Sequence, residues 1–391
     1  MSAIAEPASV VRTAAPSDRL LYIDNIRWTM IVLVLSMHAC VTYSPFGSWY
    51  YRDRSAMSFG TTLSFAVYQS VLQAFFMALL FFIAGYFAAA SYDRKGAGRF
   101  VRDRLFRLGL PTLVFMLLIG PATGYFVSQS WGKGGFAHQW LRHVGDGEIL
   151  SATGPMWFCA ALLIFSIAYA GLRRCGLTES KISIGDDYRS DLIAAAFVVT
   201  MAVATFLVRL VFPSGSAVLN MQLANFSQYI LAFAAGLFAY RSSWLTQIPD
   251  RLCARWGFGA IALGAPLFAA LVLFGGAMEG QIAAYSGGLN WVSAGICLWE
   301  SLTCVGVSLG LIALYRRFFD WQGAIAHWMS ANAFGVYLIH PPILIGIALL
   351  LHGVEVAPPA KAAILTALTA LATFLVAAPL LRRAPLLRAI V

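Results

Sequence analysis

The sequence predicts an all-α fold, a polytopic membrane helical bundle with about ten transmembrane helices, N-in and C-in. Of the 391 residues, 60% are hydrophobic and 11% are charged, and the mean hydropathy is +0.75. Soluble domains have roughly 45–50% apolar and about 25% charged residues. The apolar residues form continuous runs rather than an alternating pattern, which argues against a membrane β-barrel. We expect 1–20 to be a flexible cytoplasmic tail and 21–391 a single integral membrane domain.

Each expected helix is an apolar run close to the length of about 20 residues that crosses the hydrocarbon. Backbone groups in lipid have no water to pair with, so these spans should be α-helices. The first run is too long for a signal-peptide core and lacks a good cleavage site, so we expect it to be retained as a helix. The spans lie at 25–44, 68–90, 105–127, 155–172, 191–212, 224–240, 256–276, 290–314, 329–351 and 360–381.

The distribution of lysine and arginine predicts the orientation in the membrane. With a cytoplasmic N-terminus, 21 of the 27 basic residues fall on the inner side and five on the outer side, with Arg209 inside a span. The loop 91–107 alone contributes six of them. Cytoplasmic loops carry such an excess and face anionic lipid. We therefore assign the net charge of +10 to contact with the lipid bilayer and expect no nucleic acid partner.

Two outer loops, 45–67 and 128–154, are long enough to build a lid or an acceptor site. The alternative is that their Trp and Tyr side chains are ordinary anchors at the membrane interface. The six cysteines include no Cys-x-x-Cys pair, so we infer neither a disulfide framework nor a metal site.

Five titratable residues lie inside expected spans, where such side chains are costly and mark function by default. They are Arg27, His38, Arg209, Glu300 and His340. Arg27 and His38 are 11 residues apart, so on a helix they differ by about 20° in direction and about 16.5 Å along the axis. Taken alone, Arg27 could be a snorkelling arginine and His38 a histidine that makes a helix-packing hydrogen bond. Their position on one helix face makes both of these simpler interpretations weaker.

Three further residues each admit two interpretations. Asp24 is either the N-cap of the first helix or the partner that orients Arg27. Glu300 either pairs with an arginine or histidine, or binds an acceptor hydroxyl. His340 precedes two prolines in "YLIHPPI"; a helix break there indicates a cavity edge, whereas the alternative is a capping or packing histidine. We expect Arg209, near the outer end of its span, to snorkel.

The segment "YIDNIRWTMIVLVLSMHA" resembles the opening of the acyltransferase 3 family of integral membrane O-acyltransferases, in which an arginine and a histidine share this spacing on the first helix. "FFMALLFFIAGYF" and "FVRDRLFRLGLP" are similar to the family's second helix and Arg-x-x-Arg motif, matched by Arg104 and Arg107. "GPMWFCAALLIFSIAYA" and "SANAFGVYLIHPPILI" resemble its fourth and late helices. Within the family, the glucan biosynthesis protein C branch, which is succinyltransferase-like, is the most similar.

The resemblance implies transfer of an acyl group, acetyl or succinyl-like, from cytoplasmic acyl-coenzyme A to a hydroxyl of a carbohydrate or glycan at the outer side of a bacterial cytoplasmic (inner) membrane. It also implies that Arg27 and His38 are essential, and from the residues themselves we expect no metal. A neutral histidine can accept the proton of the attacking alcohol, or it can carry the acyl group itself. We favour His38 as general base, with Asp24 and Glu300 as further catalytic candidates.

An arginine can bind phosphate through two parallel hydrogen bonds. We therefore expect Arg27 to bind the coenzyme A donor at the cytoplasmic mouth, helped by Arg99, Arg102, Arg104 and Arg107. The separation of Arg27 from His38 is comparable to an extended pantetheine arm. His340 is a candidate for substrate binding. Two other classes remain open: a multi-pass transporter or flippase for a glycan-related or anionic small molecule, and a non-catalytic component of a polysaccharide-assembly complex.

Overall fold

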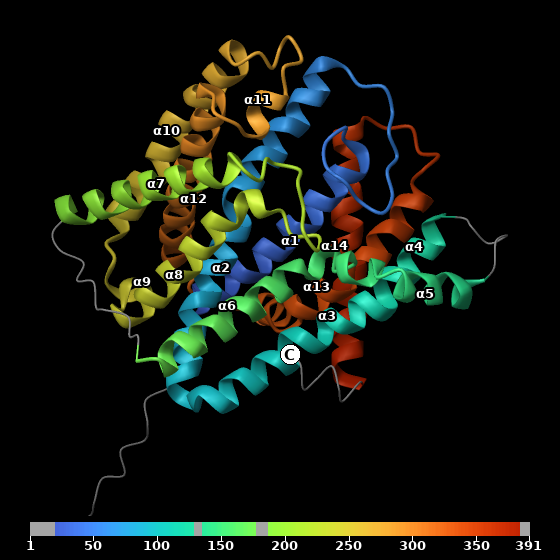
Figure 1. Ribbon diagram of the computed structural model, residues 1–391, viewed down its shortest axis with the longest axis horizontal. Helices are drawn as coiled ribbons and strands as arrows, with labels where there is room; N and C mark the ends of the chain where they lie inside the picture. The colour runs from blue at the N-terminus through green and yellow to red at the C-terminus, as the bar shows by residue number, and fades with distance from the viewer. Residues whose placement is uncertain (1–19, 129–134, 177–186, 384–391) are drawn as a thin grey trace, which may run out of the picture.

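The computed structural model describes residues 20–128, 135–176 and 187–383, and in these ranges the chain is all-α, as predicted (Figure 1). The long helices are α1 (Leu21–Tyr43), α2 (Phe59–Arg104), α6 (Trp157–Arg174), α7 (Asp187–Arg209), α8 (Phe226–Arg241), α10 (Asp250–Phe274), α12 (Trp291–Phe318), α13 (Ala324–Leu350) and α14 (Pro358–Arg383). The short helices are α3 (Leu110–Val114), α4 (Gly120–Ser128), α5 (Phe136–Gly145), α9 (Trp244–Gln247) and α11 (Ala283–Ser286).

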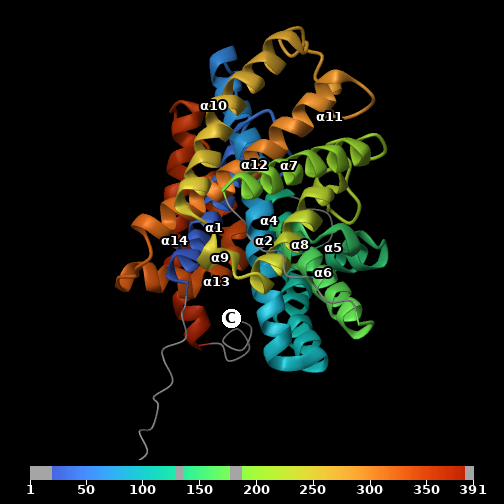
Figure 2. The same cartoon turned by 90° about the vertical axis from the view of Figure 1, so that its left-hand side faces the viewer.

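In the part of the chain that the structure describes, nine helical stretches are long and apolar enough to cross a membrane. One of them, Phe59–Val127, contains two of the expected spans, 68–90 and 105–127. Gly96 interrupts this stretch with a left-handed backbone (φ 73°, ψ 168°), and the chain turns back there (Figures 1 and 2). Glycine adopts this conformation without a steric penalty. Gly96 therefore lets one helical stretch reverse direction, so that it contains two membrane-length segments.

Small residues allow the closest helix contacts. Where α2 crosses α8, an added Cβ at Gly85 would collide with the carbonyl of Phe233, and one at Gly236 would collide with the carbonyl of Phe82. Lipid tails are as apolar as leucine, so helices in membranes associate through such close packing rather than through the hydrophobic effect. This crossing fixes the position of α2, which forms one wall of the site described below.

Hydrogen bonds sort the loops into two groups at opposite ends of the bundle. At one end, Tyr22 Oη donates to the carbonyl of Leu245 over 2.9 Å, and Arg241 pairs with Asp93. The start of α1, the turn within α2 and the connection after α8 therefore lie at this end. The opposite end holds the segment that follows α1, where Lys361 Nζ lies 2.9 Å from Asp53 Oδ2.

Candidate active site

Two histidines from distant parts of the chain meet inside the bundle. His38 Nδ1, on α1, lies 3.1 Å from His340 Nε2, on α13, although 302 residues separate them. The two rings are almost parallel, with centroids 5.1 Å apart and planes inclined by 13°. Trp49, from the segment after α1, stacks on a face of the His38 ring at 3.9 Å, and its ring centroid lies 6.4 Å from that of His340. His340 is fully buried, so the two imidazoles meet edge to edge inside the bundle.

Pro341 explains how His340 is oriented. We expected the two prolines to break the helix, but α13 runs without interruption through Pro341 and Pro342, so that prediction is wrong. Only the hydrogen-bond ladder is interrupted, because a proline at 341 has no N–H for the carbonyl of Tyr337 four residues earlier. The imidazole takes its place: His340 Nδ1 lies 2.7 Å from Tyr337 O.

These contacts assign the tautomers of both rings when they are neutral. A carbonyl oxygen only accepts, so His340 Nδ1 carries its proton and His340 Nε2 is an acceptor. His38 Nδ1 then donates to His340 Nε2. The assignment follows from the partners, since hydrogen positions are inferred. The remaining nitrogen, His38 Nε2, therefore holds an unused lone pair, and His38 lines a cavity.

This cavity has a volume of about 1210 Å³. Its lining includes Trp49 and Tyr50 from the segment after α1, and Trp140 and His143 from α5. Both long loops that we expected on the outer side therefore contribute walls, which favours the lid or acceptor-site interpretation over simple membrane anchoring. Glu300 lines the same cavity, so two predicted site residues, His38 and Glu300, border one space. His340 is not part of the lining and reaches the cavity only through its contact with His38.

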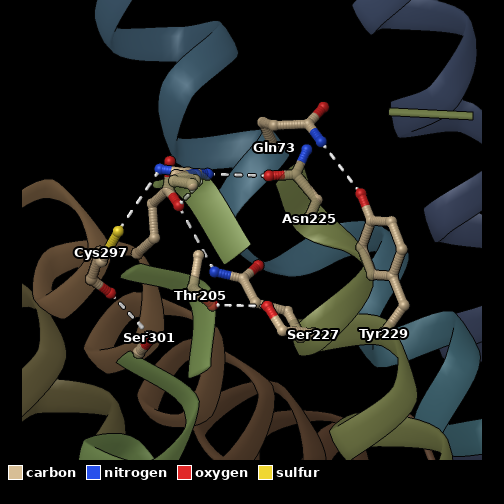
Figure 3. Close-up of polar contacts among 10 residues, drawn as sticks. Gln73, Thr205, Asn225, Ser227, Tyr229, Cys297 and Ser301 are labelled. Carbon is tan, nitrogen blue, oxygen red and sulfur yellow. Dashed lines mark hydrogen bonds and ion pairs between the residues drawn. The ribbon is translucent and has the colours of Figure 1, made fainter. Parts of the chain in front are cut away.

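Glu300 pairs with Arg209, which is only 2% exposed. The expectation that Arg209 snorkels to the interface is therefore wrong: its Nη2 lies 2.7 Å from Glu300 Oε2 and 2.8 Å from Asn225 Oδ1. Its Nη1 lies 3.8 Å from the sulfur of Cys297. Figure 3 shows Asn225 and Cys297 on either side of this buried group. Glu300 therefore pairs with an arginine, which was one of its two expected roles.

Arg27 lies at the start of α1 and outside the cavity lining. Its Nη1 donates to Asp24 Oδ1 over 3.2 Å, and its side chain is 50% exposed. Asp24 is not the N-cap, because α1 begins at Leu21 and the N-cap position is Leu20. The helix is continuous from Leu21 to Tyr43, so Arg27 and His38 do share the face that their spacing predicts.

The predicted donor-binding arginines lie around the return from α2 to α3. Arg99, Arg102 and Arg107 are exposed, and the guanidinium of Arg104 lies 5.1 Å from the ring centre of Phe100. Arg107 is part of a π-helical turn, Leu105–Gly109, a deviation that is frequent at functional sites. These side chains are at the same end of the bundle as Arg27, but the structure does not place them in the cavity with His38.

All six cysteines are free thiols. Within the described residues, no group of three or more His, Cys, Asp or Glu side chains is arranged to hold a metal ion.

A bundle of membrane-length helices around a buried histidine pair defines a polytopic membrane protein with an internal polar site. A family model described as an acyltransferase domain matches residues 20–378. The chain therefore belongs to the acyltransferase 3 family and is an acyltransferase, which confirms the family predicted from the motifs. No curated protein and no solved structure shows a significant match to the chain.

Proposed function

We propose that this enzyme is an O-acyltransferase that moves an acetyl or succinyl-like group from cytoplasmic acyl-coenzyme A to a hydroxyl of a carbohydrate or glycan. The observation that carries the proposal is the histidine pair: His38 donates through Nδ1 to His340 Nε2 at 3.1 Å, which leaves Nε2 of a cavity-lining ring as a base. General bases of this kind contribute about 10²–10⁴-fold to a rate.

In the proposed reaction, His38 Nε2 accepts the proton of the acceptor hydroxyl while that oxygen attacks the thioester carbon. The new C–O bond forms as the C–S bond breaks, and the departing sulfur takes the proton from His38. His340 stabilises the transient charge on His38 because its Nε2 accepts the Nδ1 hydrogen bond. The stacked ring of Trp49 limits the movement of His38. The same nitrogen is also the atom that would attack in an acyl-histidine mechanism.

The donor is proposed to enter from the end at which α1 begins. Arg27 is half exposed there, and it offers the forked donor group that phosphate oxygens pair with. The exposed Arg99, Arg102 and Arg107 at the same end would attract the nucleotide. The axial rise of about 16.5 Å between Arg27 and His38 would be spanned by the pantetheine arm.

The orientation is proposed from charge, since the expected spans assign 21 of the 27 lysines and arginines to the side of the membrane on which the first helix begins. That side is then cytoplasmic, both termini are inside, and the acceptor enters from the outer side of a bacterial cytoplasmic membrane. The cavity walls from the two long outer loops support this route. Membership of the glucan biosynthesis protein C branch is part of the proposal and depends on the resemblance alone.

The test is an assay of purified protein in lipid nanodiscs with radiolabelled acetyl- and succinyl-coenzyme A and an extract of cell-envelope glycans. His38→Ala should abolish label transfer while the protein still inserts and unfolds at the same temperature. His327→Ala, a histidine on α13 outside the cavity lining, is the matched control. Full transfer by His38→Ala would refute the general-base role.

A carrier is the second candidate, because a buried Arg209–Glu300 pair inside a membrane cavity is also typical of transport pathways. Donor binding separates the two. Coenzyme A at 100 times its Kd should stabilise an acyltransferase by about 2.7 kcal/mol. No shift in the unfolding temperature at saturating coenzyme A, combined with saturable glycan uptake into vesicles, would favour the carrier.

A further inference from the structure

The part of the cavity wall that contains Arg209 and Glu300 is built as a binding site rather than as simple packing. Arg209 brings a cation that is 2% exposed, and it is neutralised by Glu300 at 2.7 Å. The pair does not use all its hydrogen-bonding atoms. Arg209 Nε is buried without a partner among the described residues. The contacts of Glu300 with Arg209 and Gln228 both use Oε2, so Oε1 of this cavity-lining residue has no hydrogen-bond partner among the described residues.

A buried polar group without a partner costs about 1–3 kcal/mol, so its presence calls for an explanation. The unused atoms here are one acceptor and one donor beside a pair of zero net charge. This set suits hydroxyl groups, which both donate and accept. An anionic ligand fits this wall less well, because the Glu300 carboxylate would repel it and already neutralises Arg209.

Aromatic rings also line the cavity. Phe268, Tyr285 and Trp157 line it, and all three are partly buried. A flat apolar ring next to hydroxyl-binding groups matches the two surfaces of a sugar, whose C–H faces are apolar and whose edges carry hydroxyls.

Polar side chains of α2 join this wall to the histidine pair. Gln69 accepts a hydrogen bond from Ser44 at 3.0 Å beside the His38 end, and Gln73 donates to Tyr229 at 3.1 Å on the other side. These glutamines are one helical turn apart, about 6 Å along the axis. Figure 3 shows Gln73 next to Asn225 and Tyr229, with its amide oxygen pointing away from Tyr229. Gln69, Ser70 and Gln73 all line the cavity.

We propose that the Arg209–Glu300 wall is a subsite for a neutral glycan, which receives the acyl group at His38 while a second sugar ring is held by Glu300, Arg209 and Asn225. This inference rests on the proposed acyltransferase function and specifies its acceptor: an uncharged sugar chain longer than one ring. The cavity volume of about 1210 Å³ accommodates it, since typical small-molecule sites hold roughly 300–1,000 Å³.

The first experiment measures sugar binding without any turnover. Thermal unfolding of the purified protein is followed with maltose, cellobiose, glucose and galacturonic acid, each at saturating concentration. A disaccharide should raise the unfolding temperature more than glucose does, and galacturonic acid should have no effect. A shift with galacturonic acid alone, or no shift with any neutral sugar, would overturn the proposal.

The variants must avoid leaving a lone buried charge, which can prevent folding. The double variant Arg209→Met with Glu300→Gln removes both charges together. It should fold, lose the disaccharide shift, and show an acceptor KM raised about tenfold or more, as expected from loss of hydrogen bonds to charged groups. Asp191→Asn is the matched control, because it removes a carboxylate from a pair with Arg255 outside the cavity lining.

The two levels of the proposal fail differently. Suppose that coenzyme A release depends on His38, but the folded double variant keeps the acceptor KM and the disaccharide shift of the wild type. This result would overturn the subsite and leave the acyltransferase function intact. Absence of coenzyme A release with every donor, alongside a disaccharide shift that the double variant loses, would remove the proposed reaction while retaining the sugar site.

Discussion

The Nδ1–H of His340 donates a hydrogen bond of 2.7 Å to the carbonyl oxygen of Tyr337. This is the carbonyl that Pro341 leaves without a backbone donor. This one contact determines which nitrogen of His340 carries hydrogen, and through it which nitrogen of His38 is basic. Pro341 thus controls the proton position on His38, although His38 lies 302 residues from His340 along the chain. Such second partners commonly fix the tautomer of a functional histidine.

His340 should therefore act as a positioning residue. We expect His340→Ala to lower kcat about 10²-fold, within the range of general-base contributions, with little change in the donor KM. The acid limb of the pH profile of kcat should move, because His38 would lose its hydrogen-bond partner. His340→Asn, which can still accept from His38, should recover part of the rate. An unchanged pH profile in His340→Ala would contradict the pairing role.

Arg27 should contribute to donor binding rather than to chemistry. Arg27→Lys keeps the charge but loses the forked geometry, so we expect the coenzyme A donor KM to rise about tenfold, equivalent to about 1.4 kcal/mol, with kcat nearly constant. Arg317→Lys, an exposed arginine at the end of α12, is the matched control. A fall in kcat at constant donor KM would instead place Arg27 at the reacting atoms.

The sequence predicted the elements better than the contacts between them. The shared face of Arg27 and His38 followed from helical spacing alone, since α1 is one continuous helix. The stacking of Trp49 on His38 had no periodic signal, because Trp49 lies in a segment without regular structure. Arg209 was misinterpreted because its place near a span end suggests the interface, whereas its burial depends on Glu300, 91 residues further along the chain.

The segment after α1, which carries Trp49, should depend on an ion pair for its position. Asp53 and Lys361 lie 2.9 Å apart and their side chains are only 15% and 10% exposed. We expect Asp53→Asn to destabilise this segment by about 1–3 kcal/mol, because it weakens a largely desolvated charge-assisted bond. Trypsin should then cleave faster after Arg52 or Arg54, as measured by mass spectrometry. Glu355→Gln, at an exposed position, is the control and should not change the cleavage rate. Equal cleavage rates in the two variants would show that the Asp53–Lys361 ion pair does not hold the segment in place.

The close crossing of α2 and α8 should tolerate no side chain. In Gly236→Ala the new methyl group would meet the carbonyl of Phe82, so we expect a loss of about 1–3 kcal/mol through overpacking. Gly259→Ala in α10 is the control, because a Cβ there meets nothing within 4 Å and alanine favours the helix. The unfolding temperatures in nanodiscs should fall for the first variant and stay level or rise for the second.

Pro341→Ala offers the sharpest test of the histidine pair, because it should separate activity from stability. The new N–H would bond the carbonyl of Tyr337 and compete with His340 Nδ1 for that oxygen. The helix should gain stability, since an interior proline costs about 3 kcal/mol relative to alanine. We expect kcat to fall about two- to tenfold, as for loss of a hydrogen bond worth about 0.5–1.5 kcal/mol.

Pro342→Ala is the matched control for this variant. It should stabilise α13 in the same way, but the carbonyl that it pairs belongs to Leu338, to which no imidazole is bonded in the described structure. Its kcat should therefore stay at the wild-type value while its unfolding temperature rises. If both variants rise in stability and both keep full kcat, the freed carbonyl of Tyr337 does not orient His340, and the basicity of His38 Nε2 must have another origin.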